Sequence, residues 1–348
     1  MKEYNLHSDV FEKAEKVYGN PLPENVKNRL EWEVSHTEEN HYEELYKTAA
    51  DIMGQISISG CTVRGTTGCS LIAYLLGITD VNPILFDLRP ELLMGLEGDK
   101  PPVLSVNVSN SQYNSVLQRL GLDEVDYKKA SDNHDLAPEL TTSVYCELIQ
   151  ELARKTSLQP EKINYEETIE EFNRIEKDGN VDLVTFDDLE IMGDAEVVRE
   201  MIQYLQPHTF DDYVKIFSAA HGTNVWEGMQ RELVRADMIK MDDFISSRDD
   251  VYDFLIQVGL DRSDALENSE RIRKGKGVSE HLKLLLLDMD VPKWRIIILD
   301  EMKYVFPRAH GISYMKLFWR LVYYRMHFGD TVYMQCLSDV KDKFGCEE

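Results

Sequence analysis

The chain has 348 residues, enough for two or three domains, and its 43% hydrophobic and 29% charged residues are typical of a folded globular protein. It carries 63 acidic and 38 basic residues, a net charge of −25, so the protein as a whole repels DNA and any phosphate-binding surface must be local. No apolar run approaches the roughly 20 residues of a membrane span, which excludes a membrane protein.

Targeting and redox signals are weak. The N-terminal residues offer no apolar stretch suited to a secretory signal. Five scattered cysteines form no CxxC pair, which argues against a disulfide framework and against a cysteine zinc site. We therefore expect a protein of the reducing cytoplasm, with no membrane partner.

The first part of the chain mixes helical and strand-like patterns, and the rest is mostly helical. Strands are indicated by β-branched runs, and helices by apolar residues at helical spacing. The expected early elements are a helical stretch at 4–52 broken by Pro21 and Pro23, a strand at 56–61, a glycine-containing loop at 64–70, a helix at 71–76, a loop-rich stretch at 77–102 and a strand at 103–108. The expected later helices lie at 141–155, 165–176, 195–205, 210–218, 225–235, 247–258, 263–274, 278–288, 291–304 and 312–328.

The loop at 64–70 could hold a phosphate. Gly65 and Gly68 would let backbone N–H groups approach an anion, a helix starting near Ser70 would add its dipole, and Arg64 would add charge. No lysine follows the second glycine, so the loop is not a Walker loop. An ordinary turn between a strand and a helix explains the same residues.

A second candidate is the basic segment 271–277. It holds Arg273, Lys274 and Lys276, and the window 271–327 has 12 basic and 5 acidic residues, the only local positive surplus suited to nucleotide or DNA. The alternative is a solvated helix end capped by glycine.

Two histidine segments complete the candidates. His221 lies in SAAHGT at 218–223, and His310 ends FPRAH at 306–310, just before a helix rich in aromatic residues. A histidine beside glycine can meet a ligand closely. The alternatives are a turn with a hydrogen-bonded histidine and an aromatic stripe that belongs to the core.

Nine short motifs, in one collinear order, resemble the catalytic core of PolC-type DNA polymerase III, the bacterial family C replicative polymerase. They are VYGNPLPE (17–24), VRGTTGCS (63–70), GITDVNP (77–83), GDKPP (98–102), PHTF (207–210), HGTNVW (221–226), SRDD (247–250), RKGKG (273–277) and FPRAH (306–310). The resemblance implies an α/β plus all-α fold: a small, reduced nucleotidyltransferase-type polymerase palm followed by large helical fingers, with the family's other domains missing. The expected parts are a helical N-terminal connector at 1–55, a palm-like α/β region at 56–145 and a fingers-like region at 146–348.

The resemblance also implies roles for individual residues. The palm loop that helps hold the incoming triphosphate corresponds to Arg64, Gly65, Gly68 and Ser70. Fingers positions that face nucleotide and template correspond to His221, Gly222, Thr223, Arg273, Lys274, Lys276, Arg308 and His310. A replisome protein is a further possible partner.

The main departure from the family lies at its Asp-x-Asp pair, which holds two Mg²⁺ ions for phosphoryl transfer. The aligned positions here are Val103 and Ser105, so no intact catalytic residue and no metal site are expected. A third family aspartate corresponds loosely to Asp135. The first glycine–serine of the palm loop is replaced by Thr62 and Val63.

Three functions remain open. The first is a non-catalytic polymerase-like protein, without a cofactor, that binds nucleotide, a DNA end or a replisome partner through its fingers. The second is an active DNA-directed DNA polymerase or nucleotidyltransferase that holds Mg²⁺ through other carboxylates, such as Asp99, Asp135 or Glu139. The third is an acidic protein-interaction or DNA-mimicking module.

Overall fold

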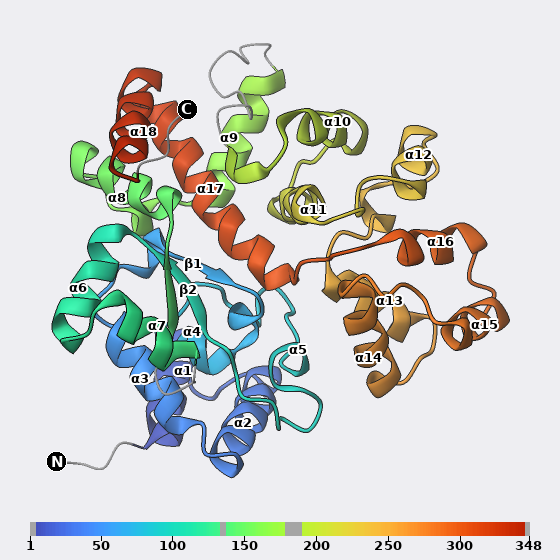
Figure 1. The fold of residues 1–348 in the computed structure, drawn as a ribbon, viewed down its shortest axis with the longest axis horizontal. Helices are drawn as coiled ribbons and strands as arrows, with labels where there is room; N and C mark the ends of the chain where they lie inside the picture. Colours follow the sequence, from blue (N-terminus) through green and yellow to red (C-terminus); the bar gives the residue numbers. More distant parts are fainter. Residues whose placement is uncertain (1–4, 133–136, 178–189, 345–348) are drawn as a thin grey trace. The chain divides into compact units, whose positions relative to one another are not determined.

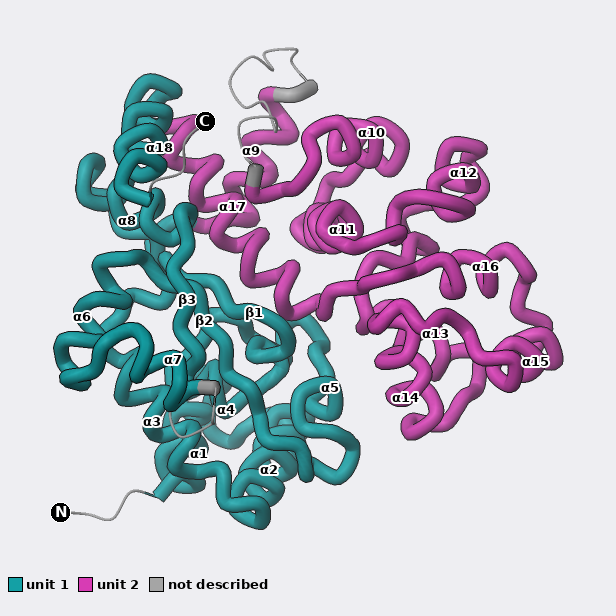
Figure 2. Tube along the Cα trace, viewed as in Figure 1, with its two compact units in different colours: residues 1–163, 328–348 teal, residues 164–327 magenta. Residues whose placement is uncertain are grey.

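The computed structural model describes residues 5–132, 137–177 and 190–344 (Figure 1). The chain forms two compact units: unit 1 comprises residues 1–163 and 328–348, and unit 2 comprises residues 164–327 (Figure 2). The predicted layout, a small α/β part and a large helical part, is confirmed. The predicted boundaries near residues 55 and 145 stay a prediction, and the two units do not share them.

Unit 1 is built around a three-stranded sheet. Its strands are β1 (Thr62–Arg64), β2 (Ser105–Val108) and β3 (Glu139–Thr142), in the order β1-β2-β3. Strand β1 pairs antiparallel with β2, and β2 pairs parallel with β3. The helices of unit 1 are α1 (Leu6–Tyr18), α2 (Glu24–Glu39), α3 (Glu43–Met53), α4 (Leu71–Leu75), α5 (Glu91–Met94), α6 (Asn110–Leu120), α7 (Glu124–Asp132), α8 (Val144–Thr156) and α18 (Asp330–Phe344).

The register gives the sheet one apolar and one polar face, because successive side chains of a strand point to opposite sides. Val63, Val106 and Leu140 are paired across the three strands and are buried. Arg64, Ser105 and Glu139 are paired in the same way one position away, so they share the opposite face. Ser105, one position of the expected metal pair, therefore belongs to the polar face, whereas Val103 precedes the strand.

In residues 164–177 and 190–327, unit 2 is built of helices and their connecting segments, with one isolated bridge between Thr223 and Tyr304. Side chains cap the starts of several of its helices, among them Asp194, Thr209 and Ser247, and Thr209 and Ser247 each form a capping box with an aspartate. The helices are α9 (Tyr165–Lys177), α10 (Ala195–Leu205), α11 (Phe210–His221), α12 (Met229–Arg235), α13 (Arg248–Gln257), α14 (Arg262–Arg273), α15 (Glu280–Asp288), α16 (Lys293–Glu301) and α17 (Arg308–Phe328).

Several sequence expectations need correction. The strand predicted at 56–61 is wrong: Ile58–Gly60 is a 3-10 turn, and the strand begins at Thr62. The helix predicted from residue 141 begins at Val144, because the preceding residues form β3. The helical stretch predicted at 4–52 is three helices. None of the described helices is long and apolar enough to cross a bilayer.

Candidate functional site

The glycine-containing loop between β1 and α4 is fixed by buried polar side chains. Thr67 is fully buried; its hydroxyl donates to the backbone oxygen of Arg64 at 3.0 Å and accepts the N–H of Ser105 at 2.9 Å. Gly65 adopts a left-handed φ of +59°, which favours glycine. Thr67 therefore connects the loop to the middle strand of the sheet.

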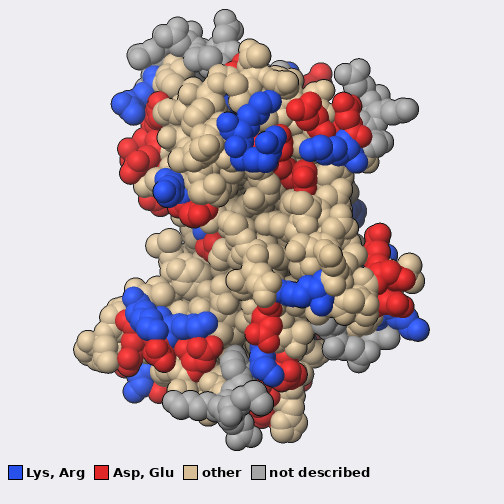
Figure 3. All heavy atoms as spheres, turned by 90° about the vertical axis from the view of Figure 1, so that its left-hand side faces the viewer, with Lys and Arg blue, Asp and Glu red and all other residues tan. Residues whose placement is uncertain are grey.

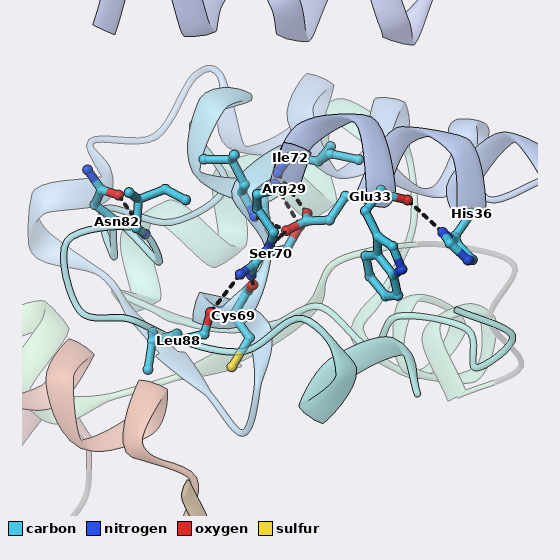
Figure 4. Close-up of polar contacts among 12 residues, drawn as sticks. Arg29, Glu33, His36, Cys69, Ser70, Ile72, Asn82 and Leu88 are labelled. Atoms are coloured by element: carbon cyan, nitrogen blue, oxygen red, sulfur yellow. Dashed lines mark hydrogen bonds and ion pairs between the residues drawn. The ribbon is translucent and has the colours of Figure 1, made fainter. Parts of the chain in front are cut away.

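The other end of the loop is held by Glu33, a fully buried carboxylate on α2 (Figure 4). It accepts hydrogen bonds from the Ser70 hydroxyl at 3.0 Å and from the backbone N–H groups of Leu71 at 2.9 Å and Ile72 at 3.1 Å. Arg29 donates to the same carboxylate at 2.6 Å. These are charge-assisted contacts, among the strongest hydrogen bonds in proteins.

Glu33 therefore occupies the place that the sequence analysis gave to a phosphate. The start of α4 offers its N–H groups to this carboxylate, and Ser70 is buried beneath it. Gly68 is also buried, while Arg64 is half-buried at the edge of the loop. The four predicted palm-loop residues lie together, but the helix start that they share already holds an anion.

At the expected metal pair, the described residues place one carboxylate, that of Glu139, in contact with Ser105. Val103 is 41% exposed and has no ligand atom, whereas Ser105 is buried and its hydroxyl donates to Glu139 Oε2 at 2.6 Å. Glu139 is adjacent to Ser105 because β2 and β3 are paired at those two residues.

The side chains of Val103, Ser105 and Glu139 do not fit two Mg²⁺ ions. Hard divalent cations are held by several carboxylate oxygens, and Glu139 is the one carboxylate among these three residues. Asp99 is exposed on the loop after α5, and Asp135 lies outside the described residues. Within the described ranges, no group of three or more His, Cys, Asp and Glu side chains is arranged to hold an ion.

In unit 2, the structure brings the other predicted segments together along one extended strip, residues 303–306. Thr223 exchanges backbone hydrogen bonds with Tyr304, at 2.9 Å in one direction and 3.2 Å in the other. On the same strip, the N–H of Val305 reaches the oxygen of Arg273, and the oxygen of Phe306 accepts the N–H of Arg248 at 2.9 Å. Segments far apart in the sequence thus meet at one place.

Aromatic rings and both predicted histidines line this strip. His310 stacks on Phe306 with ring centroids 4.8 Å apart, and His221 meets the edge of Phe306. His221 Nδ1 lies 3.1 Å from the backbone oxygen of Phe217. Burial lowers the pKa of His221, although the Phe217 carbonyl opposes this, so the ring is neutral at physiological pH.

Ion pairs fix the cations behind the strip. Glu270 accepts from Arg248 at 2.6 Å and from Arg273 at 3.0 Å. Burial alone would raise the pKa of Glu270, but the two guanidinium groups outweigh it and hold that pKa at about 2. Arg308 is tied in the same way, through its side chain to Asp211 and through its N–H to Asp249 at 2.9 Å.

The basic segment after α14 keeps two cations at the surface. Lys274 and Lys276 are exposed, although Lys274 lies 3.6 Å from the Glu270 carboxylate. The segment is shaped by Arg271, which donates to the oxygens of Lys276 and Gly277. Both predicted lysines are therefore available to an anion, whereas Arg273 and Arg308 first neutralise the protein's own carboxylates.

The surface charge of the face shown in Figure 3 is mixed. Lys and Arg side chains stand beside Asp and Glu side chains there, without a continuous basic stripe among the residues drawn in colour. Such a face gives no extended track for a nucleic-acid backbone.

Two residues that organise these sites were missed from the sequence. Glu33 and Glu270 are single glutamates on helices, in a chain with 63 acidic residues. Only their burial and their partners distinguish them from surface glutamates. Glu139 was weighed only as an alternative metal ligand, because the strand that carries it was not predicted.

Comparison with known proteins supports the resemblance found in the sequence. The family model described as "Bacterial DNA polymerase III alpha NTPase domain" matches residues 4–123. DNA polymerase III PolC-type of Thermotoga petrophila is 24% identical over 479 aligned positions, which cover 97% of this chain and 35% of the relative. The same protein of Listeria welshimeri is 37% identical over 131 residues, 38% of this chain and 9% of the relative.

The longer alignment also shows a difference. It has 479 positions against the 348 residues of this chain, so more than a hundred positions of the Thermotoga protein have no counterpart here. The alignment with DNA polymerase III PolC-type of Caldanaerobacter subterraneus is also longer than this chain, with 23% identity over 483 positions. The chain spans about a third of the length of these two curated relatives.

Proposed function

Since the chain is related to PolC-type DNA polymerase III along nearly its whole length, we propose that it is a non-catalytic replication protein that binds a deoxynucleoside triphosphate through unit 2. The proposal that the chain is non-catalytic rests on the residues at positions 103 and 105. A side chain without ligand atoms and a hydroxyl bound to Glu139 replace the oxygens that two-metal phosphoryl transfer needs.

The proposal that the chain binds a deoxynucleoside triphosphate rests on the strip at 303–306. Exposed Lys274 and Lys276 stand beside it, and His221 with its neighbouring aromatic rings provides surface against which a base can stack. Because Arg273 is half-buried against Glu270, its guanidinium positions the segment more than it adds positive field. The palm-loop residues are not part of this proposal, because Glu33 holds the start of α4.

The test is calorimetric binding of dATP to the full chain in buffer with EDTA. We expect binding without metal, and a loss of about fivefold or more in affinity when Lys274→Gln and Lys276→Gln are combined, because two charges leave the site. The matched control combines Lys283→Gln and Lys293→Gln, which removes two exposed charges elsewhere in unit 2 and should leave the affinity unchanged.

Two outcomes would overturn the binding proposal. One is a folded protein to which dATP does not bind. The other is an equal loss of affinity in the control variant, which would show only a general effect of net charge. A folded chain that binds neither dATP nor a labelled template strand at low salt would instead favour an acidic protein-interaction module.

A further inference from the structure

A cavity of about 390 Å³ lies beside strand β3 in unit 1, within the usual range for small-molecule sites of roughly 300–1,000 Å³. The proposed nucleotide site does not use it, although Arg64 belongs to the loop that the polymerase resemblance singles out and Glu139 contacts Ser105 of the expected metal pair. The lining residues that carry the argument below are Arg64, Glu124, Lys128, Ser131 and Glu139.

Among the residues that the structure describes, the cavity lining carries positive and negative charges in equal number. Arg64 and Glu139 are half-buried and lie on the same face of the sheet, one on each side of Ser105. Lys128 and Glu124, both exposed on α7, stand at the rim. The two cations and two carboxylates of the described lining cancel, so these residues give the site no preference for a ligand of high net charge.

Polar groups in the cavity lack partners. Arg64 makes no side-chain hydrogen bond or ion pair with any residue of the described ranges, and its Nε is buried. The Ser131 hydroxyl is buried and likewise unpaired among those residues. A buried polar group left unsatisfied is energetically costly, so a ligand that supplies the missing partners binds more tightly.

Glu139 is satisfied on one side only. Its Oε2 accepts the Ser105 hydroxyl at 2.6 Å, which holds the carboxylate in place, and Oε1 has no partner in the part of the chain that the structure describes. The site therefore presents a fixed anionic oxygen across the sheet from a guanidinium that has no carboxylate of its own.

We propose that this cavity binds a small zwitterion of the class of free α-amino acids, with its carboxylate on Arg64 and its ammonium group on Glu139. A guanidinium pairs with a carboxylate through two parallel hydrogen bonds, which suits the carboxyl end. A nucleoside triphosphate is excluded in the absence of metal, because its charge would face Glu139 and Glu124. A simple cation would face Arg64 and Lys128.

The test screens the full chain by thermal shift and calorimetry against each of the twenty L-amino acids, in buffer with EDTA. The best ligand is then compared with the acid that lacks its amino group and the amine that lacks its carboxylate. We expect at least one amino acid to bind and both analogues to bind at least about tenfold more weakly. Arg64→Gln and Glu139→Gln should each weaken binding to a similar extent.

A change in selectivity separates contact with the ligand from an effect on folding. In Glu139→Gln the deaminated acid should bind as well as the amino acid, because the ammonium group has lost its partner. Arg119→Gln is the control, an exposed arginine on α6 that does not line this cavity, and it should change nothing.

The proposal fails if no amino acid binds the folded chain, or if the wild type binds the deaminated acid equally well. It also fails if metal-free dATP competes for the cavity in a way that Arg64→Gln abolishes. The nucleotide proposal is judged separately by the Lys274 and Lys276 variants, since those residues belong to the other unit.

Discussion

The sheet of unit 1 and the strip of unit 2 differ in what this chain shares with its polymerase relatives. In unit 1 the strand, the glycine loop and the short helix are present, but Val103 and Ser105 stand where the family resemblance leads us to expect a pair of aspartates. In unit 2 the expected segments meet, and the charged side chains of Arg273 and Arg308 are present as well. In both places the local fold is held by polar contacts within the chain, which do not depend on a bound metal or nucleotide.

In each unit, one carboxylate holds the local structure in place. Glu33 binds the loop and the start of α4 in unit 1, and Glu270 joins two arginines in unit 2. Neither needs a ligand to stay in place. The comparison predicts that Glu33 and Glu270 act on stability, whereas other residues, not engaged in these ion pairs, act on binding.

The largest effect is expected from Glu33→Gln. The change removes a buried charge that Arg29 requires and leaves one of the two N–H groups at the start of α4 facing an amide nitrogen. Because breaking a buried ion pair by removing one partner costs about 3–5 kcal/mol, we expect a loss of that size in urea unfolding. Glu31→Gln, exposed on the same helix, should cost less than about 0.5 kcal/mol. Equal effects of the two changes would contradict the role of Glu33.

The effect of Glu270→Gln should depend on pH. The folded pKa is about 2 against an ordinary value of 4.5, so the charged form stabilises the fold above pH 4.5, and the contribution fades as pH falls toward 2. We expect the variant to lose about 2–3 kcal/mol at pH 7 and to approach the wild type near pH 2. Unfolding curves at several pH values, with Glu267→Gln as an exposed control on the same helix, measure this. A difference that stays constant with pH would refute the ion-pair explanation.

A smaller effect is expected from Ser105→Asp, which places a second carboxylate beside Glu139. Without metal the two like charges should lower stability by about 1–2 kcal/mol, and Mn²⁺ should recover part of that loss by binding between them. Ser105→Asn has the same shape without the charge and should not respond to Mn²⁺. A Mn²⁺ response of the wild type equal to that of the Asp variant would show that the site already binds metal.

The smallest effect is expected from Asp249→Asn, which tests a carboxyl group whose pKa is raised in the folded protein, whereas that of Glu270 is lowered. Burial raises the pKa of Asp249, although Arg248 and the Arg308 N–H oppose it, so its charged form is disfavoured in the folded protein. The substitution keeps an oxygen for that N–H and removes the buried charge. We therefore expect no loss, or a gain below about 1 kcal/mol, at neutral pH, and convergence with the wild type as pH falls. A loss of more than 1 kcal/mol at pH 7 would mean that the charge is needed.

The sequence predicted most helices, since apolar periodicity and caps such as Ser247 and Asp250 are local signals. It missed β3, because four residues before a helix carry little periodicity and their partner β2 is more than thirty residues away. The convergence of residues 221–223, 273 and 303–306 was implied only by the family resemblance. The part played by Glu33 could not be predicted, because it depends on burial between α2 and α4.

Primer extension by the full chain tests the central claim most directly. Purified protein is incubated with a labelled primer–template and all four dNTPs in Mg²⁺, in Mn²⁺ and in EDTA, with and without the substitutions Val103→Asp and Ser105→Asp. Because one carboxylate cannot hold two metal ions, we predict that the wild type extends no primer above the EDTA control in either metal. Metal-dependent extension by the wild type would contradict the account.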